Sequence, residues 1–320
     1  MQKLNSIKCD ICPNECHLVP GDSGVCGIWS NIDGSLASLY NHRISICSID
    51  RIEKRPLFHF LPDTKTLSVG FLGCQFFCHH CENFEISKNF GEEKDYPQIS
   101  PHQLVEMSKH GIKSISFSYN EPTLYPYYIE KVAELSSLPI IVKSNGFVHK
   151  SKWDLFLSSV DAWNIDIKGD ENTYRNVCGG RLKDVLDFLN VLVLNNKHVE
   201  VSYLPIPQTV MDKNTHENIS DILKDISENI PVHLLYLYPN YKTTETYDKK
   251  ILLDVYDIFA KKMKYVYISN VFGEMGRRNT CCKECGTVLI ERSNEIKIQK
   301  YSCCGKEIDG VWAYNSIGNF

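Results

Sequence analysis

The sequence has no apolar run long enough to cross a lipid bilayer. Its longest apolar runs, such as VHLLYLYP at residues 232–239, are far shorter than the ~20 residues that a membrane-spanning helix needs. The first residues, MQKLNSIKCDICP, also lack the apolar stretch of a secretory signal. We therefore expect a cytoplasmic protein without a membrane partner.

The chain also carries little net charge. At pH 7 the formal charge is −4 over 320 residues, so no global basic field would attract nucleic acid, and we do not expect a nucleic-acid partner. Internal repeats, low-complexity stretches and phosphate-binding glycine motifs are absent as well. With 43% hydrophobic residues, the chain is long enough for one large core with small appended modules.

Cysteine, in contrast, is abundant and unevenly distributed. The chain contains 14 cysteines, and all but Cys47 and Cys178 lie in three groups. The groups are, in chain order, Cys9, Cys12, Cys16 and Cys26; Cys74, Cys78 and Cys81; and Cys281, Cys282, Cys285, Cys303 and Cys304. In a reducing cytoplasm, such groups are typical of metal ligands rather than of disulfides.

From directly before the second group to the third, short apolar segments rich in β-branched and aromatic residues predict buried strands. They are TLSVGFLG (66–73), KSISFSY (113–119), PIIVKSN (139–145), VDAWNIDIK (160–168), HVEVSYLP (198–205), PVHLLYLY (231–238) and KYVYISN (264–270). Helical patterns alternate with them at 100–111, 127–135, 182–194, 215–228 and 249–262. In the first of these, Ser100 is the expected N-cap, Gln103 completes a capping box, and Gly111 ends the helix.

This alternation predicts an α/β fold built from parallel βαβ units. Six or seven strands suit a partial (β/α) barrel, which we place at residues 63–272. An N-terminal cysteine-rich arm (1–62) and a C-terminal zinc-ribbon-like module (273–320) would flank it. Chemistry in such folds gathers at the carboxyl ends of the strands, and the central cysteines directly follow the first one.

The central run, GCQFFCHHCENFEIS, has the spacing Cx3Cx2C and supplies three thiolates from Cys74, Cys78 and Cys81. A structural zinc or a fully ligated cluster needs four ligands. Three ligands on a 4Fe–4S cluster leave one iron open, and S-adenosylmethionine can chelate it through its amino and carboxylate groups. The alternative is zinc with His79, His80 or a distant cysteine as the fourth ligand.

Further motifs extend well beyond the cysteines. They are IEKRPLFHFLP (52–62), CENFEIS (81–87), YNEPT (119–123), SNGF (144–147), DIK (166–168) and CGG (178–180). With them the chain resembles a radical S-adenosylmethionine enzyme, and most closely the radical-SAM component of the AmmeMemoRadiSam system. Pyruvate formate-lyase activating enzymes are similar at a greater distance. The segments CDICPNECHLVPGDSGVCG and NTCCKECGTVLIER resemble the ends of the same family, so the resemblance covers nearly the whole chain.

The resemblance implies roles for the residues that match these motifs. The three central cysteines would ligate a 4Fe–4S cluster. His80 stands where relatives often place an aromatic residue against the adenine. Asn120 and Glu121 stand where the family holds the methionine amino group, and a carboxylate facing an ammonium suits that role. Glu82 replaces the glutamine that relatives usually carry, at a site expected to face the substrate.

Residues after the third and fourth strands would complete the cofactor site. Ser144, Asn145 and Asp166 lie where the family binds the ribose and the carboxylate of S-adenosylmethionine. Lys168 is a further candidate contact, although Asp166 and Lys168 could instead pair with each other. Lys143 replaces an acid that helps to hold a metal cation in activating enzymes. We hypothesise that its ammonium takes the place of that cation; the alternative is an ordinary lysine at a strand end.

The flanking cysteines predict two more metal sites. Cys9, Cys12, Cys16 and Cys26 lie in a segment too small to bury a core, so a metal would fold it; zinc and an auxiliary iron–sulfur cluster both suit four thiolates. The C-terminal group reads as a zinc ribbon with ligands Cys282, Cys285, Cys303 and Cys304. Its second half is irregular, because Cys303 and Cys304 are adjacent and the family pattern puts Tyr301 at a ligand position, so Cys281 is an alternative ligand.

The reaction implied by the resemblance is reductive cleavage of S-adenosylmethionine to a 5′-deoxyadenosyl radical, which abstracts hydrogen from an unidentified protein, peptide or small molecule. Cys178 is the best candidate for a thiol hydrogen donor. The implied partners are an external electron donor of the flavodoxin or ferredoxin type, and Memo-like and AMMECR1-like proteins. The alternative is a non-catalytic zinc or iron–sulfur scaffold, or an RNA-binding protein.

Overall fold

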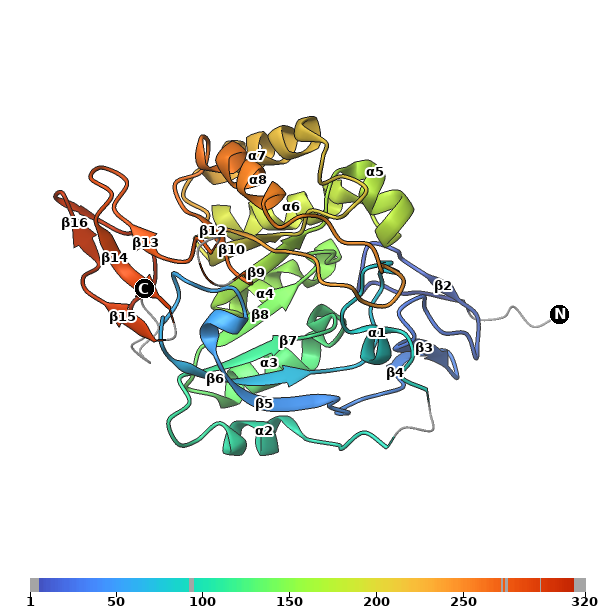
Figure 1. Ribbon diagram of the computed structural model, residues 1–320. Helices are drawn as coiled ribbons and strands as arrows, with labels where there is room; N and C mark the ends of the chain where they lie inside the picture. Colours follow the sequence, from blue (N-terminus) through green and yellow to red (C-terminus); the bar gives the residue numbers. More distant parts are fainter. Residues whose placement is uncertain (1–5, 92–94, 272, 274–275, 294, 314–320) are drawn as a thin grey trace.

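The structure, a computed structural model, describes residues 6–91, 95–271, 273, 276–293 and 295–313 (Figure 1). Among these residues, one sheet has eight strands in the order β12-β11-β10-β9-β8-β7-β6-β5. The parallel strands are β6 (Lys65–Gly70), β7 (Ser114–Ser118), β8 (Ile140–Ser144), β9 (Ala162–Ile167), β10 (His198–Tyr203), β11 (Val232–Leu234) and β12 (Val266–Ile268). All the strands predicted from the sequence are therefore confirmed, as is the α/β class.

One strand of the sheet was not predicted. Strand β5 (Ile46–Arg51) pairs antiparallel with β6 at the edge of the sheet, although it belongs to the segment assigned to the N-terminal arm. Its residues alternate between more and less exposed positions, because one face of an edge strand meets solvent. A search for continuous apolar runs does not detect such a strand.

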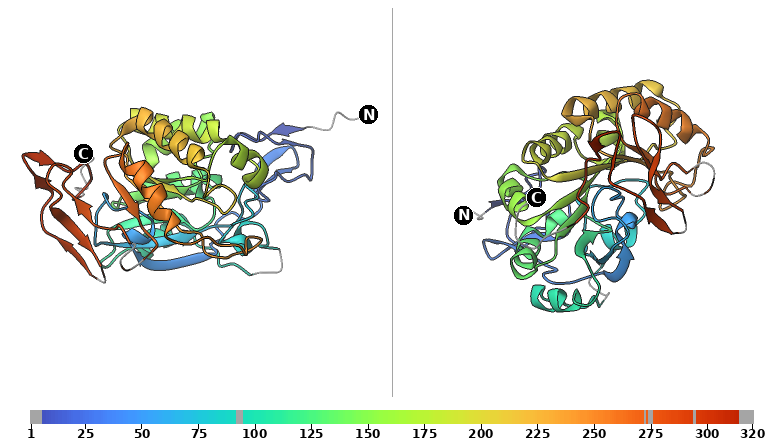
Figure 2. Two further views of the ribbon diagram at one scale, coloured as in Figure 1. Left: turned by 45° about the horizontal axis from the view of Figure 1, so that its top comes forward. Right: turned by 90° about the vertical axis from the view of Figure 1, so that its left-hand side faces the viewer.

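Helices follow the parallel strands and lie in an arc outside the sheet (Figure 2). They are α2 (Pro101–Met107), α3 (Pro126–Leu135), α4 (Trp153–Ser159), α6 (Leu182–Leu194), α7 (Lys213–Ser227) and α8 (Ile251–Ala260). The predicted capping box of α2 is confirmed: Ser100 Oγ accepts from Gln103 N–H at 3.3 Å, and Ser100 N–H donates to Gln103 Oε1 at 2.8 Å. The expected end at Gly111 is wrong, because the helix already ends at Met107.

Shorter helices connect these elements. They are η1 (Ile52–Lys54), α1 (Phe84–Ser87), η2 (Pro122–Leu124), η3 (Lys150–Lys152), α5 (Glu171–Thr173) and the π-helical turn η4 (Tyr174–Cys178). Together with α4, they were not predicted, since most are too short to show a helical period. Among the helices that the structure describes, none combines the length and apolarity needed to cross a bilayer.

The N-terminal arm lies at the carboxyl ends of the strands, beside α1 (Figure 1). Its elements are two hairpins, β1 (Ile7–Lys8) with β2 (His17–Leu18) and β3 (Trp29–Ile32) with β4 (Ser35–Ser38). The indole N–H of Trp29 donates to the carbonyl of Leu124 at 2.8 Å, and Lys152 pairs with Asp10 at 2.5 Å. These contacts attach the arm to loops that follow the strands.

The C-terminal module lies at the opposite end of the barrel (Figure 1). It contains the sheet of β13 (Thr280–Cys281), β14 (Val288–Arg292) and β15 (Ile296–Ile298), and the hairpin of β16 (Ser302–Cys303) and β17 (Lys306–Glu307). Hydrogen bonds join it to the segment before β6: Arg292 donates to the carbonyl of Phe58 at 2.6 Å in a buried bond, and His59 bonds the carbonyl of Asp309 at 2.5 Å. The division into 1–62, 63–272 and 273–320 stays a prediction.

Candidate active site

A cavity of about 510 Å³ opens at the carboxyl ends of the parallel strands. Its walls combine segments that follow β6, β7, β8 and β9, so residues far apart in the sequence meet there. The central cysteines and most predicted cofactor contacts line it: Cys74, Cys78, Cys81, His80, Asn120, Glu121, Lys143, Asn145, Asp166 and Lys168. Ser144 lies behind the wall, where its hydroxyl donates to Glu121 Oε1 at 2.8 Å.

The loop that carries the central cysteines depends on Gly73. This glycine has φ +79°, and a Cβ on it would lie 2.3 Å from Ile28 Cγ1 and 2.8 Å from the carbonyl oxygen of Cys26. Its N–H donates to the carbonyl of Ile86 at 2.9 Å, which ties the two ends of the loop together. The loop can therefore lie directly against the N-terminal arm.

Without a bound metal, the surroundings of the central thiols favour their protonated form. Burial raises the pKa of Cys74 and Cys81, so each thiol resists ionisation in the absence of a metal. A hydrogen bond with Cys178, followed by burial, raises the pKa of Cys78 well above its usual value. A bound metal would reverse this preference, because it stabilises the thiolate directly.

Cys78 has two close neighbours that the sequence did not connect with each other. The ligand atoms of Cys78, His80 and Cys178 lie within 4.8 Å of one another. Burial lowers the pKa of His80 to about 3, and its Nε2 is buried without a hydrogen-bond partner. Cys178 is fully buried and does not contribute to the cavity wall. This trio is the arrangement in the described chain that best suits the alternative of a zinc ion in the barrel.

Glu121 occupies the centre of a buried hydrogen-bond network between β7 and β8. Its Oε1 accepts from Thr123 N–H at 3.1 Å, from the Thr123 hydroxyl at 2.6 Å and from the Ser144 hydroxyl at 2.8 Å. Its Oε2 accepts from Asn145 N–H at 2.8 Å. Burial raises the pKa of this carboxyl even though these donors oppose the shift. The carboxylate is thus fixed at the cavity wall.

The two predicted asparagines contact the cysteine loop directly. Asn120 Nδ2 donates to the carbonyl of Gly73 at 2.9 Å, and Asn120 Oδ1 accepts from Phe71 N–H at 3.0 Å. Asn145 Nδ2 donates to Cys74 Sγ at 3.7 Å. Both side chains therefore hold the loop, a function that the sequence did not indicate.

Lys143, Asp166 and Lys168 form one charged group. Lys143 Nζ donates to Asp166 Oδ1 at 2.6 Å, to Asn164 Oδ1 at 2.7 Å and to Ser202 Oγ at 3.3 Å. Lys168 Nζ donates to Asp166 Oδ2 at 3.2 Å. Burial opposes ionisation of Asp166, but the two lysines outweigh it and lower the pKa of Asp166 to about 2. Asp166 therefore does pair with Lys168, as the alternative predicted, and it pairs with Lys143 as well.

A second charged group in the cavity wall was missed by the sequence analysis. Arg55 donates to Asp50 and, at 2.8 Å, to the hydroxyl of Tyr119, which itself donates to Asp50 Oδ2 at 3.0 Å. The guanidinium of Arg55 lies 4.4 Å from the centre of the Tyr119 ring. The only available signal was that Arg55 and Tyr119 belong to motifs of the resemblance; Asp50 had none, because its strand was not predicted.

The N-terminal cysteines gather at the arm. Cys9, Cys12 and Cys26 are buried, and Cys16 is half-buried. A Cβ on Gly24 would lie 3.6 Å from the sulfur of Cys16 and 3.8 Å from that of Cys26. The fold therefore brings the predicted ligands of this group to one place beside the cysteine loop of the barrel.

The C-terminal cysteines form a tighter group. The sulfurs of Cys282, Cys285, Cys303 and Cys304 all lie within 4.8 Å of one another. Tetrahedral zinc with Zn–S bonds of about 2.3 Å holds its sulfurs about 3.8 Å apart, and the distance from Cys285 to Cys303 is 3.6 Å. Cys281 stays outside the group, and the ring of Tyr301 stacks on Trp312. Cys303 therefore takes the position that the sequence left open.

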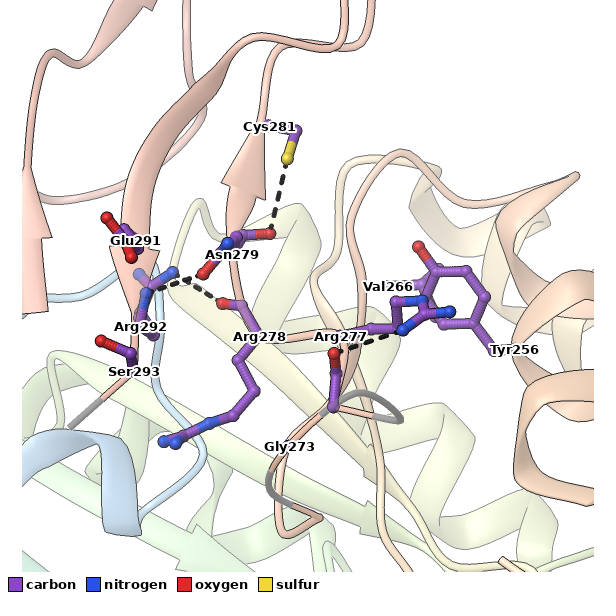
Figure 3. A pocket seen from close by; sticks show the side chains of 11 residues that line it. Tyr256, Val266, Gly273, Arg277, Arg278, Asn279, Cys281, Glu291, Arg292 and Ser293 are labelled. Carbon is purple, nitrogen blue, oxygen red and sulfur yellow. Dashed lines mark hydrogen bonds between the residues drawn. The ribbon is translucent and has the colours of Figure 1, made fainter. Parts of the chain in front are cut away.

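A second cavity, of about 540 Å³, lies where the C-terminal module meets the barrel (Figure 3). Arg277, Arg278 and Arg292 contribute to its wall, and Figure 3 shows their side chains pointing in different directions. In the described part of the chain, none of the central cysteines or predicted cofactor contacts lines it. The two cavities are similar in volume, but only the first joins thiols to the predicted contacts.

The sequence of the chain matches a known family and two known proteins. Residues 69–226 match the radical SAM superfamily. The chain is 33% identical to MJ0808, an uncharacterized protein of Methanocaldococcus jannaschii, over 96% of this chain and 96% of that protein. It is 26% identical to MJ0674 of the same organism, over 56% of this chain and 55% of that protein.

The solved structures that match the chain share little sequence with it. A domain of pyruvate-formate lyase-activating enzyme from Bacteroides vulgatus has 14% identity and a TM-score of 0.40, and the match covers 47% of this chain and 94% of that chain. SuiB of Streptococcus suis, bound to S-adenosylmethionine, has 14% identity and a TM-score of 0.49 over 66% of this chain and 49% of that chain. The chain thus spans about half the length of SuiB.

The superfamily match and the cysteine loop lie in the same part of the chain. The match begins within β6, immediately before Cys74, and ends within α7, so it contains the cysteine loop and the strands that carry the predicted contacts. The relationship to MJ0808 covers 96% of the chain and so extends well beyond this match. The chain belongs to the radical SAM superfamily, and this membership implies a 4Fe–4S cluster and S-adenosylmethionine.

Proposed function

We propose that the protein is a radical S-adenosylmethionine enzyme in which Cys74, Cys78 and Cys81 hold the 4Fe–4S cluster. The observation that carries this proposal is the shared cavity of about 510 Å³, where these thiols and the predicted cofactor contacts from neighbouring strand ends face one space. When bound, the cluster and S-adenosylmethionine supply a 5′-deoxyadenosyl radical that abstracts hydrogen from the substrate.

The side chains of the cavity suit both groups. Three thiols leave one iron of a 4Fe–4S cluster without a protein ligand. The buried Nε2 of His80 has no hydrogen-bond partner within the described chain, so a bound adenine would supply one. Glu121 Oε2 accepts one hydrogen bond, from Asn145 N–H, and keeps a lone pair for the ammonium of S-adenosylmethionine.

The charged group of Lys143, Asp166 and Lys168 would meet the opposite end of the methionine moiety. Lys143 already directs its N–H donors at three acceptors inside the barrel. Lys168 has one such bond, to Asp166, and so keeps N–H donors for the carboxylate of S-adenosylmethionine. We therefore propose Lys168 as the carboxylate contact and Lys143 as the residue that holds Asp166 in place, while Ser144 and Asn145 hold Glu121.

Cys178 remains a proposed hydrogen donor, but its position also suits a second role. Its sulfur lies behind Cys78, outside the cavity wall, and this position favours a hydrogen bond to the Cys78 sulfur over transfer of hydrogen to a substrate. A donor role predicts that Cys178→Ala still cleaves S-adenosylmethionine but forms no product. If the Cys178 thiol instead bonds to the Cys78 sulfur, Cys178→Ala should shift the reduction potential of the 4Fe–4S cluster.

The sequence resemblance supports narrower proposals. It favours an activating-enzyme-like protein of the AmmeMemoRadiSam type, with a protein, peptide or small-molecule substrate and with Memo-like and AMMECR1-like partners. Reduction of the cluster would come from a flavodoxin- or ferredoxin-type donor. The spacing of the C-terminal sulfurs supports a structural zinc on Cys282, Cys285, Cys303 and Cys304.

The test is cleavage of S-adenosylmethionine. The protein is reconstituted anaerobically with iron and sulfide and reduced with dithionite, and 5′-deoxyadenosine and methionine are followed by mass spectrometry. We expect product from the wild type and from Cys47→Ala, which removes an exposed cysteine that belongs to none of the three groups, but not from Cys78→Ala. A protein that takes up no iron and forms no product would indicate that the central cysteines bind zinc, and it would favour a non-catalytic scaffold.

A further inference from the structure

The N-terminal cysteines lie in a loop whose backbone is arranged around the sulfurs. Cys9 N–H donates to the carbonyl of Cys16 at 2.9 Å and closes the loop. Backbone N–H groups also point at the thiols: Ile28 N–H donates to Cys26 Sγ at 3.4 Å, and the sulfurs of Cys9 and Cys12 each accept from the backbone two residues further on. Such donors stabilise thiolates, and hydrogen bonds of this kind to the ligand sulfurs help to set the reduction potential of a cluster.

The spacing of these sulfurs separates them from the C-terminal group. Among the described residues, the C-terminal cysteines have four sulfurs within 4.8 Å of one another, as a single ion requires, whereas no three of Cys9, Cys12, Cys16 and Cys26 do. All four nevertheless interact electrostatically with one another. In a cluster, each thiolate binds a different iron, so the sulfurs stand farther apart than around one zinc ion.

The N-terminal site touches the loop that carries the central cysteines. A Cβ on Gly73 would meet the carbonyl oxygen of Cys26, so the two backbones are in van der Waals contact one residue before Cys74. Lys88 joins them further: its ammonium donates to the carbonyl of Val25 at 3.2 Å and to the carbonyl of Cys74. Lys88 thus places a positive charge between the two sets of thiols.

We propose that Cys9, Cys12, Cys16 and Cys26 bind a second 4Fe–4S cluster, which relays electrons to the cluster on the central cysteines. The relay rests on the proposed function. Four protein ligands leave no iron open for substrate, and the contact at Gly73 and Lys88 gives electron transfer a short path to the central cluster.

The electron balance needs one external reductant, a low-potential ferredoxin- or flavodoxin-type donor. One electron passes from the donor to the oxidised N-terminal cluster, whose charge changes from 2+ to 1+. The same electron then passes to the central cluster and reduces it from 2+ to 1+, while the N-terminal cluster returns to 2+. No proton or bond changes partner in either step.

The first experiment measures metals in a chain without the central cysteines. In the variant Cys74→Ala, Cys78→Ala and Cys81→Ala, the proposal predicts about half the iron of the wild type and an electron paramagnetic resonance signal after dithionite reduction. The matched control Cys285→Ser should keep the iron of the wild type and lose zinc. A triple variant without iron, with additional zinc in place of it, would overturn the proposal.

The second experiment tests the relay in Cys12→Ser by comparing two reductants. Flavodoxin would deliver electrons through the N-terminal cluster, whereas dithionite is small enough to reach the central cluster directly. The proposal predicts that the ratio of flavodoxin-driven to dithionite-driven S-adenosylmethionine cleavage falls about tenfold or more. Lys88→Met, which leaves all ligands in place, serves as a second variant if Cys12→Ser does not fold, and it should lower the same ratio by more than its effect on the midpoint potential of the central cluster accounts for. An unchanged ratio in both variants would refute the relay. If no chain cleaves S-adenosylmethionine while the triple variant keeps iron, the proposed function fails and the second cluster stands.

Discussion

The contacts of Glu121 within the chain decide which substitution can test its role in cofactor binding. Its carboxylate accepts two backbone N–H groups, from Thr123 and Asn145, and two hydroxyls. A hydrogen bond to a charged group contributes about 1.5–3 kcal/mol, so Glu121→Ala should lose roughly 3–6 kcal/mol of unfolding free energy from the two backbone donors alone. Since whole domains are stable by about 5–15 kcal/mol, this variant is a poor probe of binding.

Glu121→Gln is the sharper substitution. Its carbonyl oxygen can keep the bonds at the Oε1 position, while its NH₂ group meets the N–H of Asn145 and leaves that donor unpaired, at a cost of about 1–3 kcal/mol. The variant should still fold. Loss of the charged contact with the ammonium should weaken binding of S-adenosylmethionine roughly 10- to 100-fold.

Glu82→Gln is the matched control, because Glu82 lines the same cavity but is exposed. Binding is measured by equilibrium dialysis with labelled S-adenosylmethionine on cluster-loaded protein, and stability by urea unfolding. We expect a large loss of affinity for Glu121→Gln and little change in stability for Glu82→Gln. Equal affinities in the two variants would refute the assignment of Glu121 to the ammonium.

Three further predictions address other parts of the molecule. Burial lowers the pKa of His59 to about 4 from 6.5, so the unfolded chain binds the proton first. The contribution of His59 to stability should be complete above pH 6.5 and fall by roughly 3 kcal/mol as the pH drops to 4; urea unfolding of His59→Gln should show a correspondingly shallower slope than the wild type, and an equal slope would contradict the assignment. Lys88→Met removes a positive charge beside Cys74 and should lower the midpoint potential of the central cluster by on the order of 50 mV in a redox titration; no shift would place Lys88 too far away. Cys303→Ala should lose zinc in elemental analysis and Cys281→Ala should keep it, whereas the reverse result would make Cys281 the ligand in place of Cys303.

The sequence predicted the parallel strands well, because each is buried on both faces and therefore reads as a continuous apolar run. Strand β5 (Ile46–Arg51) escaped this criterion, since it alternates at the edge of the sheet. That omission also hid Asp50 and its contacts with Arg55 and Tyr119, which come from three separate segments. Contacts between distant segments depend on strand order, and strand order is not visible in local patterns.

The site residues show the same limit. The motifs indicated which residues gather in the cavity, because the ends of parallel strands meet at one edge of a sheet. They did not indicate how those residues pair. The acceptors of Lys143 lie on the neighbouring strand β9 and on β10, the next strand beyond it, and its pairing with them depends on the strand register. Likewise, the choice between Cys303 and Cys281 in the C-terminal group became clear only from the positions of the sulfurs.

The most direct test of the central claim is an electron paramagnetic resonance spectrum of the reduced protein with and without S-adenosylmethionine. The claim is that the central thiols hold a 4Fe–4S cluster with one iron open to this ligand. The triple variant that lacks Cys74, Cys78 and Cys81 is measured in parallel, so that a signal from the N-terminal cysteines can be subtracted. We predict a cluster signal whose shape changes when S-adenosylmethionine is added to the wild type, and no such change in the variant. A wild-type spectrum that is identical with and without S-adenosylmethionine would contradict the account.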